Sequence, residues 1–387
     1  MTDAGARTIH DAMSPQDRPL RRGWTTGTCA TAAAKAAYAA LLTGEFPDPV
    51  EVTLPRGERV AFALAITRKD AASSTAGVVK DAGDDPDVTH GALVLATVRA
   101  AAPGSGVVFR AGAGVGIVTR AGLPVAPGEP AINPVPRRMI GDAIAEVAVA
   151  ARGSGDVEVE VGVADGECLA AKTLNPRLGI VGGLSILGTT GIVVPYSCAA
   201  WIHSIQRGID VAHAAGLAHI AGATGRQSET AVQKFHRLPE IALIDMGDFV
   251  GGMLKYLRRH PIARVTIAGG VGKMTKLAQG LLDLHANRGA VDFAALAGLA
   301  RAGGSCEAVM QQIAASNSAA EAFAHAAAAN VMLGDAVARA AQQTASGVVA
   351  DGGIEVEVVL FDRDGRLVGH APFASHHEVV PPRNRRR

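Results

Sequence analysis

Alternating apolar and polar residues mark strands in the first half of the chain. The alternation over 50–54, a turn at Arg56-Gly57 and a return over 60–66 predict a β-hairpin. A second hairpin is expected where valines alternate with polar residues over 157–163, ahead of the turn residues Asp165-Gly166. The first half therefore contains antiparallel β-structure.

Two helices are expected between these strands. Thr26 or Thr28 provides an N-cap for an alanine-rich helix that runs to about Leu42, and Gly44 ends it. Pro136 suits the first position of a second helix that continues to about 151. Together with the hairpins, these helices predict a mixed α+β domain.

The pattern changes beyond residue 175 to short apolar strands followed by glycine-rich loops and helices. Such units begin with strands at 219–223, 241–244 and 264–268, in the order expected of a parallel sheet. Helices then fill about 292–345, and a late strand at 354–361 has no assigned sheet. Ligands of parallel sheets bind at the carboxyl ends of the strands, where all three glycine-rich loops fall.

The length of 387 residues favours two domains, since one hydrophobic core seldom organises so long a chain. The predicted fold combines α/β and α+β classes: a mixed α+β N-terminal domain with hairpins, then a Rossmann-like parallel-sheet domain. The predicted parts are a disordered N-terminus at 1–20, the mixed domain at 21–175, the Rossmann-like domain at 176–350, the late strand at 351–375 and a basic tail at 376–387.

Composition narrows the class of partner. A formal charge of +1 provides no field for nucleic acid or an anionic membrane, and 4% aromatic residues suit base stacking poorly. The four cysteines form no CxxC pair, and no apolar segment resembles a signal peptide. The uncharged stretch 178–197 is long enough to span a bilayer, but its five glycines and Pro195 predict a tight binding loop instead. A cytoplasmic, soluble protein is expected.

Two glycine-rich loops of the second half are candidate ligand sites. Gly222 and Gly225 open a helix after a strand, and Asp245 follows about twenty residues on, where an acid often binds a ribose hydroxyl. The three-glycine dinucleotide fingerprint is incomplete, so a nucleoside site and a plain tight turn both fit. The loop 269–275 resembles a phosphate cradle but lacks Walker spacing, and Lys273 in it either binds a carboxylate or is solvated.

The first half contains two charged candidates. The turn 78–91 gathers acidic residues at a spacing wrong for an EF-hand; a metal site, a solvated turn and a carboxylate acting as a base or facing a cationic ligand all fit. Arg137 and Arg138 begin a helix, where cations are unfavourable unless an anion binds, although solvated arginines fit as well. The histidines are scattered, with no metal-ligand spacing, so no metal site in the protein is predicted.

Several long motifs together resemble one known family. The motifs are RRGWTTGTCATAAAKAA from Arg21, VVKDAGDDPDVTHGA from Val78, GEPAINPVPRRMI from Gly128, LNPRLGIVGGLSILGTTGIV from Leu174, GDFVGGMLK from Gly247 and GGVGKMTKLAQG from Gly269. They resemble the CbiD family, the cobalt-precorrin-5B C1-methyltransferases. The resemblance implies methyl transfer from S-adenosylmethionine to carbon 1 of cobalt-precorrin-5B, giving cobalt-precorrin-6A in the cobalt-early, anaerobic route to cobalamin.

The resemblance gives the candidate residues their roles. Those expected at S-adenosylmethionine are Gly182, Gly183, Gly188, Thr189, Gly222, Gly225, Asp245, Gly269 and Gly270. Those expected at the carboxylates of the tetrapyrrole are Lys80, Arg137, Arg138, Arg177 and Lys273. Asp84 or Asp85 is the first candidate for moving a proton. Cobalt enters only within the substrate. The expected partners are the corrinoid itself, a second copy of the chain and other corrin-pathway enzymes during hand-over.

Two rival functions are a nicotinamide-dependent reductase of a corrin intermediate and a non-catalytic corrinoid-binding protein. The incomplete dinucleotide fingerprint argues against the reductase. A binding protein would need the basic first-half motifs but not the glycine-rich loops.

Overall fold

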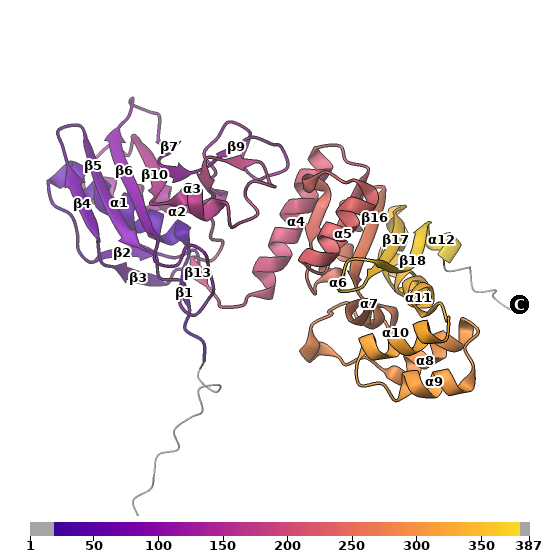
Figure 1. Cartoon of the computed structure of the whole chain (residues 1–387). Coiled ribbons are helices and arrows are strands. Elements are labelled where there is room, and N and C mark those ends of the chain that lie inside the picture. The colour runs from indigo at the N-terminus through magenta and orange to yellow at the C-terminus, as the bar shows by residue number, and fades with distance from the viewer. Residues whose placement is uncertain (1–18, 380–387) are drawn as a thin grey trace, which may run out of the picture. The chain divides into compact units, whose positions relative to one another are not determined.

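The computed structural model describes residues 19–379 (Figure 1). Residues 1–18 of the N-terminus predicted to be disordered and residues 380–387 of the predicted basic tail lie outside the described residues. The chain forms two compact units. Within the described residues, unit 1 comprises 19–117, 129–173 and 181–197, and unit 2 comprises 118–128, 174–180 and 198–379. The predicted boundary near 175 differs from this division, which places 118–128 and 174–175 in unit 2 and 181–197 in unit 1.

Unit 1 is built on a five-stranded sheet. Its order is β4 (Ile66–Lys69), β5 (Ser73–Val79), β6 (Leu93–Ala100), β10 (Val157–Val163) and β7 (Val107–Ala111). Neighbours are antiparallel except for β10 and β7, which run parallel. All four valines of β10 are at most 1% exposed, as expected for a strand with neighbours on both edges.

The alanine-rich helix α1 (Thr26–Thr43) packs against β5, β6 and α2 (Pro134–Ala151). Its small side chains let helix and sheet approach closely, and most of its alanines are fully buried. The N-cap is Thr25, whose side chain accepts a hydrogen bond from the Thr28 amide, rather than Thr26 or Thr28. Gly44 ends the helix at a φ of 92°, as predicted. Helix α2 begins at Pro134, two residues before the predicted Pro136.

One predicted hairpin is confirmed and the other is wrong. β2 (Val50–Thr53) and β3 (Arg59–Phe62) pair as an antiparallel hairpin. After β10, however, Asp165 and Gly166 are not followed by a second strand that pairs with β10. They begin the short helix α3 (Gly166–Ala170). The alternating valines do form a strand, as predicted, but β6 and β7 occupy its two edges.

The uncharged segment 178–197 forms short strands rather than one loop. They are β11 (Ile180–Val181), β12 (Gly183–Leu184) and β13 (Ile192–Val193). β12 pairs in parallel with β8 (Gly114–Val115), and β13 pairs with β1 (Gly23–Trp24). The remaining short strand of this region is β9 (Ile117–Val118).

Unit 2 contains the predicted parallel sheet. Its order is β15 (Leu243–Asp245), β14 (His219–Ala223), β16 (Arg264–Gly270), β17 (Glu355–Phe361) and β18 (Leu367–Ala374). The first four strands are parallel and β18 is antiparallel to β17. The late strand without an assigned sheet is thus β17, which extends the parallel sheet beside β16.

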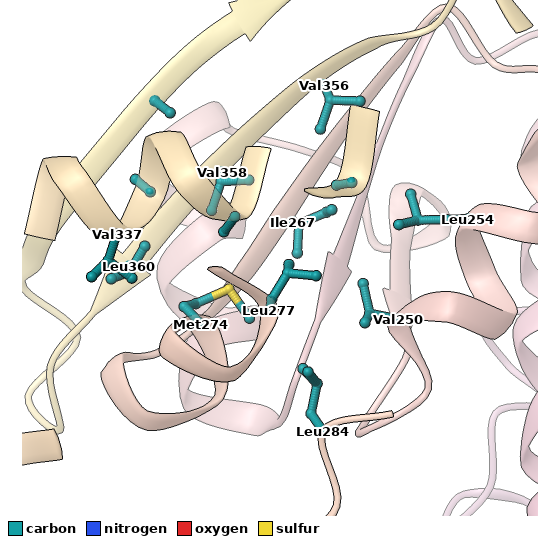
Figure 2. Packing of buried hydrophobic residues seen from close by; sticks show 14 of the residues in the cluster. Val250, Leu254, Ile267, Met274, Leu277, Leu284, Val337, Val356, Val358 and Leu360 are labelled. Carbon is teal, nitrogen blue, oxygen red and sulfur yellow. The ribbon is translucent and has the colours of Figure 1, made fainter. Parts of the chain in front are cut away.

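Helices cover both faces of this sheet. They are α4 (Cys198–Ala214), α5 (Arg226–His236), α6 (Val250–Leu257), α7 (Val271–Ala278), α8 (Phe293–Ala302), α9 (Glu307–Ala314), α10 (Ala319–Ala328), α11 (Leu333–Val348) and the short α12 (His376–Val379). Ile267 and Val358 point to the face covered by α6, α7 and α11, where the larger core lies (Figure 2). The alternate residues Ala268 and Val359 point to the face covered by α5. In the described part of the chain, no helix is long and apolar enough to cross a membrane.

Candidate functional site

The carboxyl ends of β14, β15 and β16 bring three loops of unit 2 together. From β14 the chain passes to β15 on one side and then to β16 on the other, so the direction of winding reverses between β14 and β16. Ligands of open parallel sheets bind outside the strand ends at such a reversal. The Thr224 amide donates to the Ala268 carbonyl across this point, and the Met246 amide donates to Ala223. The predicted loops therefore form one continuous edge.

The four predicted glycines on this edge serve two different purposes. A Cβ on Gly222 would lie 2.4 Å from the Met253 sulfur, and one on Gly269 would lie 2.6 Å from the Met274 methyl. These two glycines are needed for packing. A Cβ on Gly225 or Gly270 would meet no atom within 4 Å. Gly225 and Gly270 begin α5 and α7 and leave open space into which a ligand can approach the backbone.

Asp245 lies at the end of β15, half-buried on the same edge. Its main-chain carbonyl accepts a hydrogen bond of 3.1 Å from the Trp201 indole of α4. The Trp201 ring also covers Gly247, whose φ of 53° turns the chain immediately after the strand. Trp201 itself is 47% exposed, so part of its ring is free to contact a ligand.

The charges beside Asp245 are paired with one another. Arg177 binds Glu229 through two hydrogen bonds of 2.8 and 2.9 Å, and Lys273 lies 3.0 Å from Asp248. Asp245 has no ion pair with Lys or Arg among residues 19–379. Burial and then the Glu229 carboxylate raise its pKa, against the lowering influence of Arg177. A carboxylate placed this way suits a ligand that donates hydroxyls or carries a positive charge.

Arg177 and Lys273 are predicted substrate cations whose present partners are internal. Besides Glu229, the Arg177 guanidinium donates to the Leu243 carbonyl, which fixes it against β15. Lys273 donates to the Thr224 carbonyl over 2.9 Å. Lys273 thus binds a carboxylate, as one of the two predictions for it proposed, but this carboxylate is Asp248 of the protein rather than a substrate group.

In unit 1, Lys80 is turned into the protein. Its side chain is 1% exposed, and its ammonium contacts the Asp87 carboxylate and the Thr89 hydroxyl. Although burial opposes ionisation, Lys80 and hydrogen bonds from Lys80 and Thr89 together lower the pKa of Asp87. The acidic turn is thereby held by an internal ion pair, and Lys80 has little surface for a substrate carboxylate.

Asp84 and Asp85 each accept a backbone hydrogen bond. The Arg21 amide donates to Asp84 over 2.6 Å, and the Tyr196 amide donates to Asp85 over 2.8 Å. Asp84 is exposed and Asp85 half-buried. Each carboxylate retains a second oxygen, so the structure leaves both residues as candidates for proton transfer.

The two arginines at the start of α2 differ. Arg137 pairs with Glu129 over 3.1 Å and donates to the carbonyls of Ile132 and Pro130. Arg138 is exposed and makes no ion pair with any residue of the described range. Of the cations predicted to bind substrate, Arg138 alone within residues 19–379 has a side chain with neither an ion pair nor a hydrogen bond to another residue. It is the cation best able to receive an anion.

The predicted glycines of 182–189 belong to unit 1, whereas the strand-end loops belong to unit 2. A Cβ on Gly183 would lie 2.3 Å from the Gly114 backbone, and one on Gly188 would lie 2.2 Å from the Thr25 hydroxyl. Both glycines therefore allow chain segments to pack within unit 1. Gly182, with a φ of 85°, and Thr189 are exposed.

Two features of this edge could not be predicted from the sequence: the position of Trp201 and the pairing of Asp248 with Lys273. Trp201 lies on a helix that precedes the first strand of the sheet, and nothing in its neighbourhood indicates that it reaches the end of β15. Asp248, three residues after Asp245, was visible as a second acid in the same loop. The pairing of Asp248 with Lys273 depends on two loops meeting in space.

Comparisons with known proteins agree with the motifs. The family described as CbiD matches residues 13–195, and the family described as CbiD, C-terminal domain, matches residues 283–372. The chain is 60% identical to the cobalt-precorrin-5B C(1)-methyltransferase of Bradyrhizobium sp. strain BTAi1, over 97% of this chain and 100% of that protein. It is 61% identical to the protein of the same name from Halorhodospira halophila, over 94% of this chain and 99% of that one.

A solved structure is also similar: the crystal structure of cobalamin biosynthesis protein (cbiD) from Archaeoglobus fulgidus. It is 30% identical, covers 70% of this chain and 83% of its own, and has a TM-score of 0.39. With relatives that share three fifths of their residues over nearly the whole length, the chain belongs to the CbiD family.

Proposed function

We propose that this protein transfers a methyl group from S-adenosylmethionine to carbon 1 of cobalt-precorrin-5B, giving cobalt-precorrin-6A in the cobalt-early route to cobalamin. The observation that carries the proposal is the 60% identity, over 97% of the chain, with a protein of that named activity. Cobalt enters as part of the substrate.

We place the methyl donor at the carboxyl edge of the sheet in unit 2. The open space at Gly225 and Gly270 supports this placement, because a ligand can reach the amides that begin α5 and α7. Asp245, which forms no ion pair with Lys or Arg in the described part of the chain, would accept the ribose hydroxyls. The exposed part of the Trp201 ring offers a flat apolar surface for the adenine.

S-adenosylmethionine supplies an electrophilic methyl group on a sulfonium sulfur. The nucleophile is a carbon of the conjugated macrocycle, so the protein has mainly to align carbon and methyl at near-contact distance. Binding residues that fix both partners can supply much of the rate enhancement in this way. A weakly polar surrounding favours the transition state, in which the sulfonium charge is already being lost.

For the substrate, we propose that Arg138 binds one of the peripheral carboxylates through a charge-assisted pair. Its exposure and its lack of an ion pair within the described residues support this role. Asp84 or Asp85 would take up a proton that the reaction releases, since each is a carboxylate oriented by a backbone hydrogen bond to one oxygen.

The decisive experiment incubates the protein with methyl-labelled S-adenosylmethionine and cobalt-precorrin-5B, and follows the label into the ring. Labelling at carbon 1 is expected, and Asp245→Asn should slow it at limiting donor. Glu307→Gln, which removes an exposed carboxylate on α9, should have no effect. Reduction of the ring with a nicotinamide cofactor, or corrinoid binding without label transfer, would instead support one of the two rival functions.

A further inference from the structure

A cluster of histidines surrounds a buried carboxylate near the amino ends of the strands in unit 2, away from the proposed donor edge. His219 is the first residue of β14, His236 is the last residue of α5, and Glu357 is the third residue of β17. One ligand atom of each lies within 4.8 Å of the others. The three residues come from separate parts of the chain, so no spacing motif marks them.

Glu357 is the centre of this cluster. It is 2% exposed, and its two oxygens face imidazoles: His236 Nε2 lies 2.5 Å from Oε2, and His370 Nε2 lies 2.9 Å from Oε1. Neither Lys nor Arg pairs with it in the structure from residue 19 to 379. A buried carboxylate needs a compensating positive charge or complete hydrogen bonding. A metal cation would supply such a charge.

Thr266 links the third histidine to the carboxylate. Its hydroxyl donates to Glu357 Oε2 over 2.6 Å, and His219 Nε2 lies 2.8 Å from the same hydroxyl. His236 and His370 thus contact the carboxylate directly, and His219 reaches it through the Thr266 hydroxyl. Such convergence of imidazole nitrogens and a carboxylate oxygen is the usual donor set of a zinc-type site.

We propose that His219, His236 and Glu357 bind a divalent transition-metal ion of the zinc class. Tetrahedral ligands about 2.0–2.2 Å from zinc lie roughly 3.3 Å apart, so side-chain shifts of about 1 Å would gather these three atoms around an ion. Imidazole ligands favour zinc and its neighbours over magnesium or calcium, which prefer oxygen alone. The fourth position is left to a water molecule.

The surroundings supply outer-shell support for the ion. His370 holds the second oxygen of Glu357, and orienting hydrogen bonds of this kind accompany most metal-binding residues. Aromatic rings limit solvent around the histidines: Phe373 is 5.1 Å from the His219 ring and Phe235 is 4.7 Å from the His236 ring, centroid to centroid. Since the three ligands come from two strands and the end of α5, the ion would fasten that helix to the sheet.

The test uses the full-length protein, freed of metal by chelation and titrated with Zn²⁺ in a calorimeter, with melting temperature as a second measurement. We expect one ion per chain and a higher melting temperature that added chelator reverses. His236→Gln should weaken Zn²⁺ binding by about a hundredfold or more and abolish the thermal shift. His213→Gln, which changes an exposed histidine on α4, is the matched control and should behave as the wild type.

Glu357→Gln provides a second ligand variant, while the partly exposed His236 keeps the test valid if that buried variant fails to fold. With Co²⁺ in place of Zn²⁺, the wild type should show the visible absorption of tetrahedral cobalt, and His236→Gln should not. Absence of saturable Zn²⁺ binding in the wild type, or equal binding by His236→Gln, would overturn the proposal.

Discussion

Alanine substitutions at two glycines of the proposed donor edge, the carboxyl ends of β14, β15 and β16, should separate effects on stability from effects on donor binding. Gly222 and Gly270 both lie at this edge, but a new methyl group would meet very different surroundings. At Gly222 it would lie 2.4 Å from the sulfur of Met253 and 3.0 Å from that of Met246, and both methionines are fully buried. At Gly270 it would enter open space.

The sizes of the two effects follow from these contacts. Overpacking a buried site costs about 1–3 kcal/mol, so Gly222→Ala should lower Tm by roughly 2–12 °C in a unit of this size. Gly270 has φ −75° and ψ 158°, which alanine adopts readily. The poorer capping by alanine and the reduced entropy of the unfolded chain oppose each other, so stability should change by less than about 0.5 kcal/mol.

Affinity for S-adenosylmethionine should respond the other way round: Gly270→Ala, which hardly changes stability, should weaken donor binding. If the backbone of the Gly270 loop approaches the ligand, one methyl group in the way weakens binding by roughly tenfold to a hundredfold. Gly225→Ala should do the same. Titration calorimetry with S-adenosylmethionine gives the affinity, and urea unfolding gives the free energy of unfolding. Wild-type affinity in both Gly225→Ala and Gly270→Ala would remove these loops from the donor site.

Three further predictions concern charged residues. Asp245→Asn should weaken donor binding by more than about tenfold, and it should stabilise the ligand-free protein at neutral pH. Because burial raises the pKa of Asp245, its ionisation begins to oppose folding above the ordinary aspartate pKa and does so fully above the raised pKa, so the gain should shrink in acid; equal unfolding curves at all pH values would contradict this. Lys80→Met should lower the free energy of unfolding in urea by about 3 kcal/mol, because it leaves Asp87 without its buried partner. The loss should be smaller in acid, below the lowered pKa of Asp87. Wild-type stability together with a raised corrinoid KM would instead indicate that Lys80 binds the substrate. Arg138→Ala should raise the corrinoid KM without changing donor affinity, whereas the exposed Arg56→Ala should change neither; an unaltered KM in Arg138→Ala would exclude its role.

Local signals predicted the parts of the fold that depend on neighbouring residues. The hairpin at Arg56-Gly57, the end of α1 at Gly44 and the strands that lead into glycine-rich loops were all visible, because turns, caps and βα units have short-range chemistry. The second hairpin failed for the opposite reason. A strand of alternating valines indicates burial, but it does not say which strands occupy its two edges.

The candidate sites follow the same division. That Gly225, Gly270 and Asp245 lie on one edge could be predicted, because strand ends of a parallel sheet converge by rule. The sequence could not show that Lys80 turns inward to Asp87, or that His219, His236 and Glu357 lie close together, since these contacts join distant segments. Likewise, the glycines at 183 and 188 look the same in the sequence whether they admit a ligand or a neighbouring backbone.

The position of β10 between β6 and β7 has a consequence for the order of folding. During synthesis β4, β5 and β6 are made one after another and can pair at once. β7 pairs only with β10 in this sheet, and β10 is made about fifty residues later. A nascent chain that ends before residue 157 therefore leaves unpaired the edges of β6 and β7 that β10 later occupies. The chain also passes between the two units four times before unit 1 is complete at residue 197. No single cut yields either unit intact, so unit 1 reaches its native sheet only after parts of unit 2 have been synthesised.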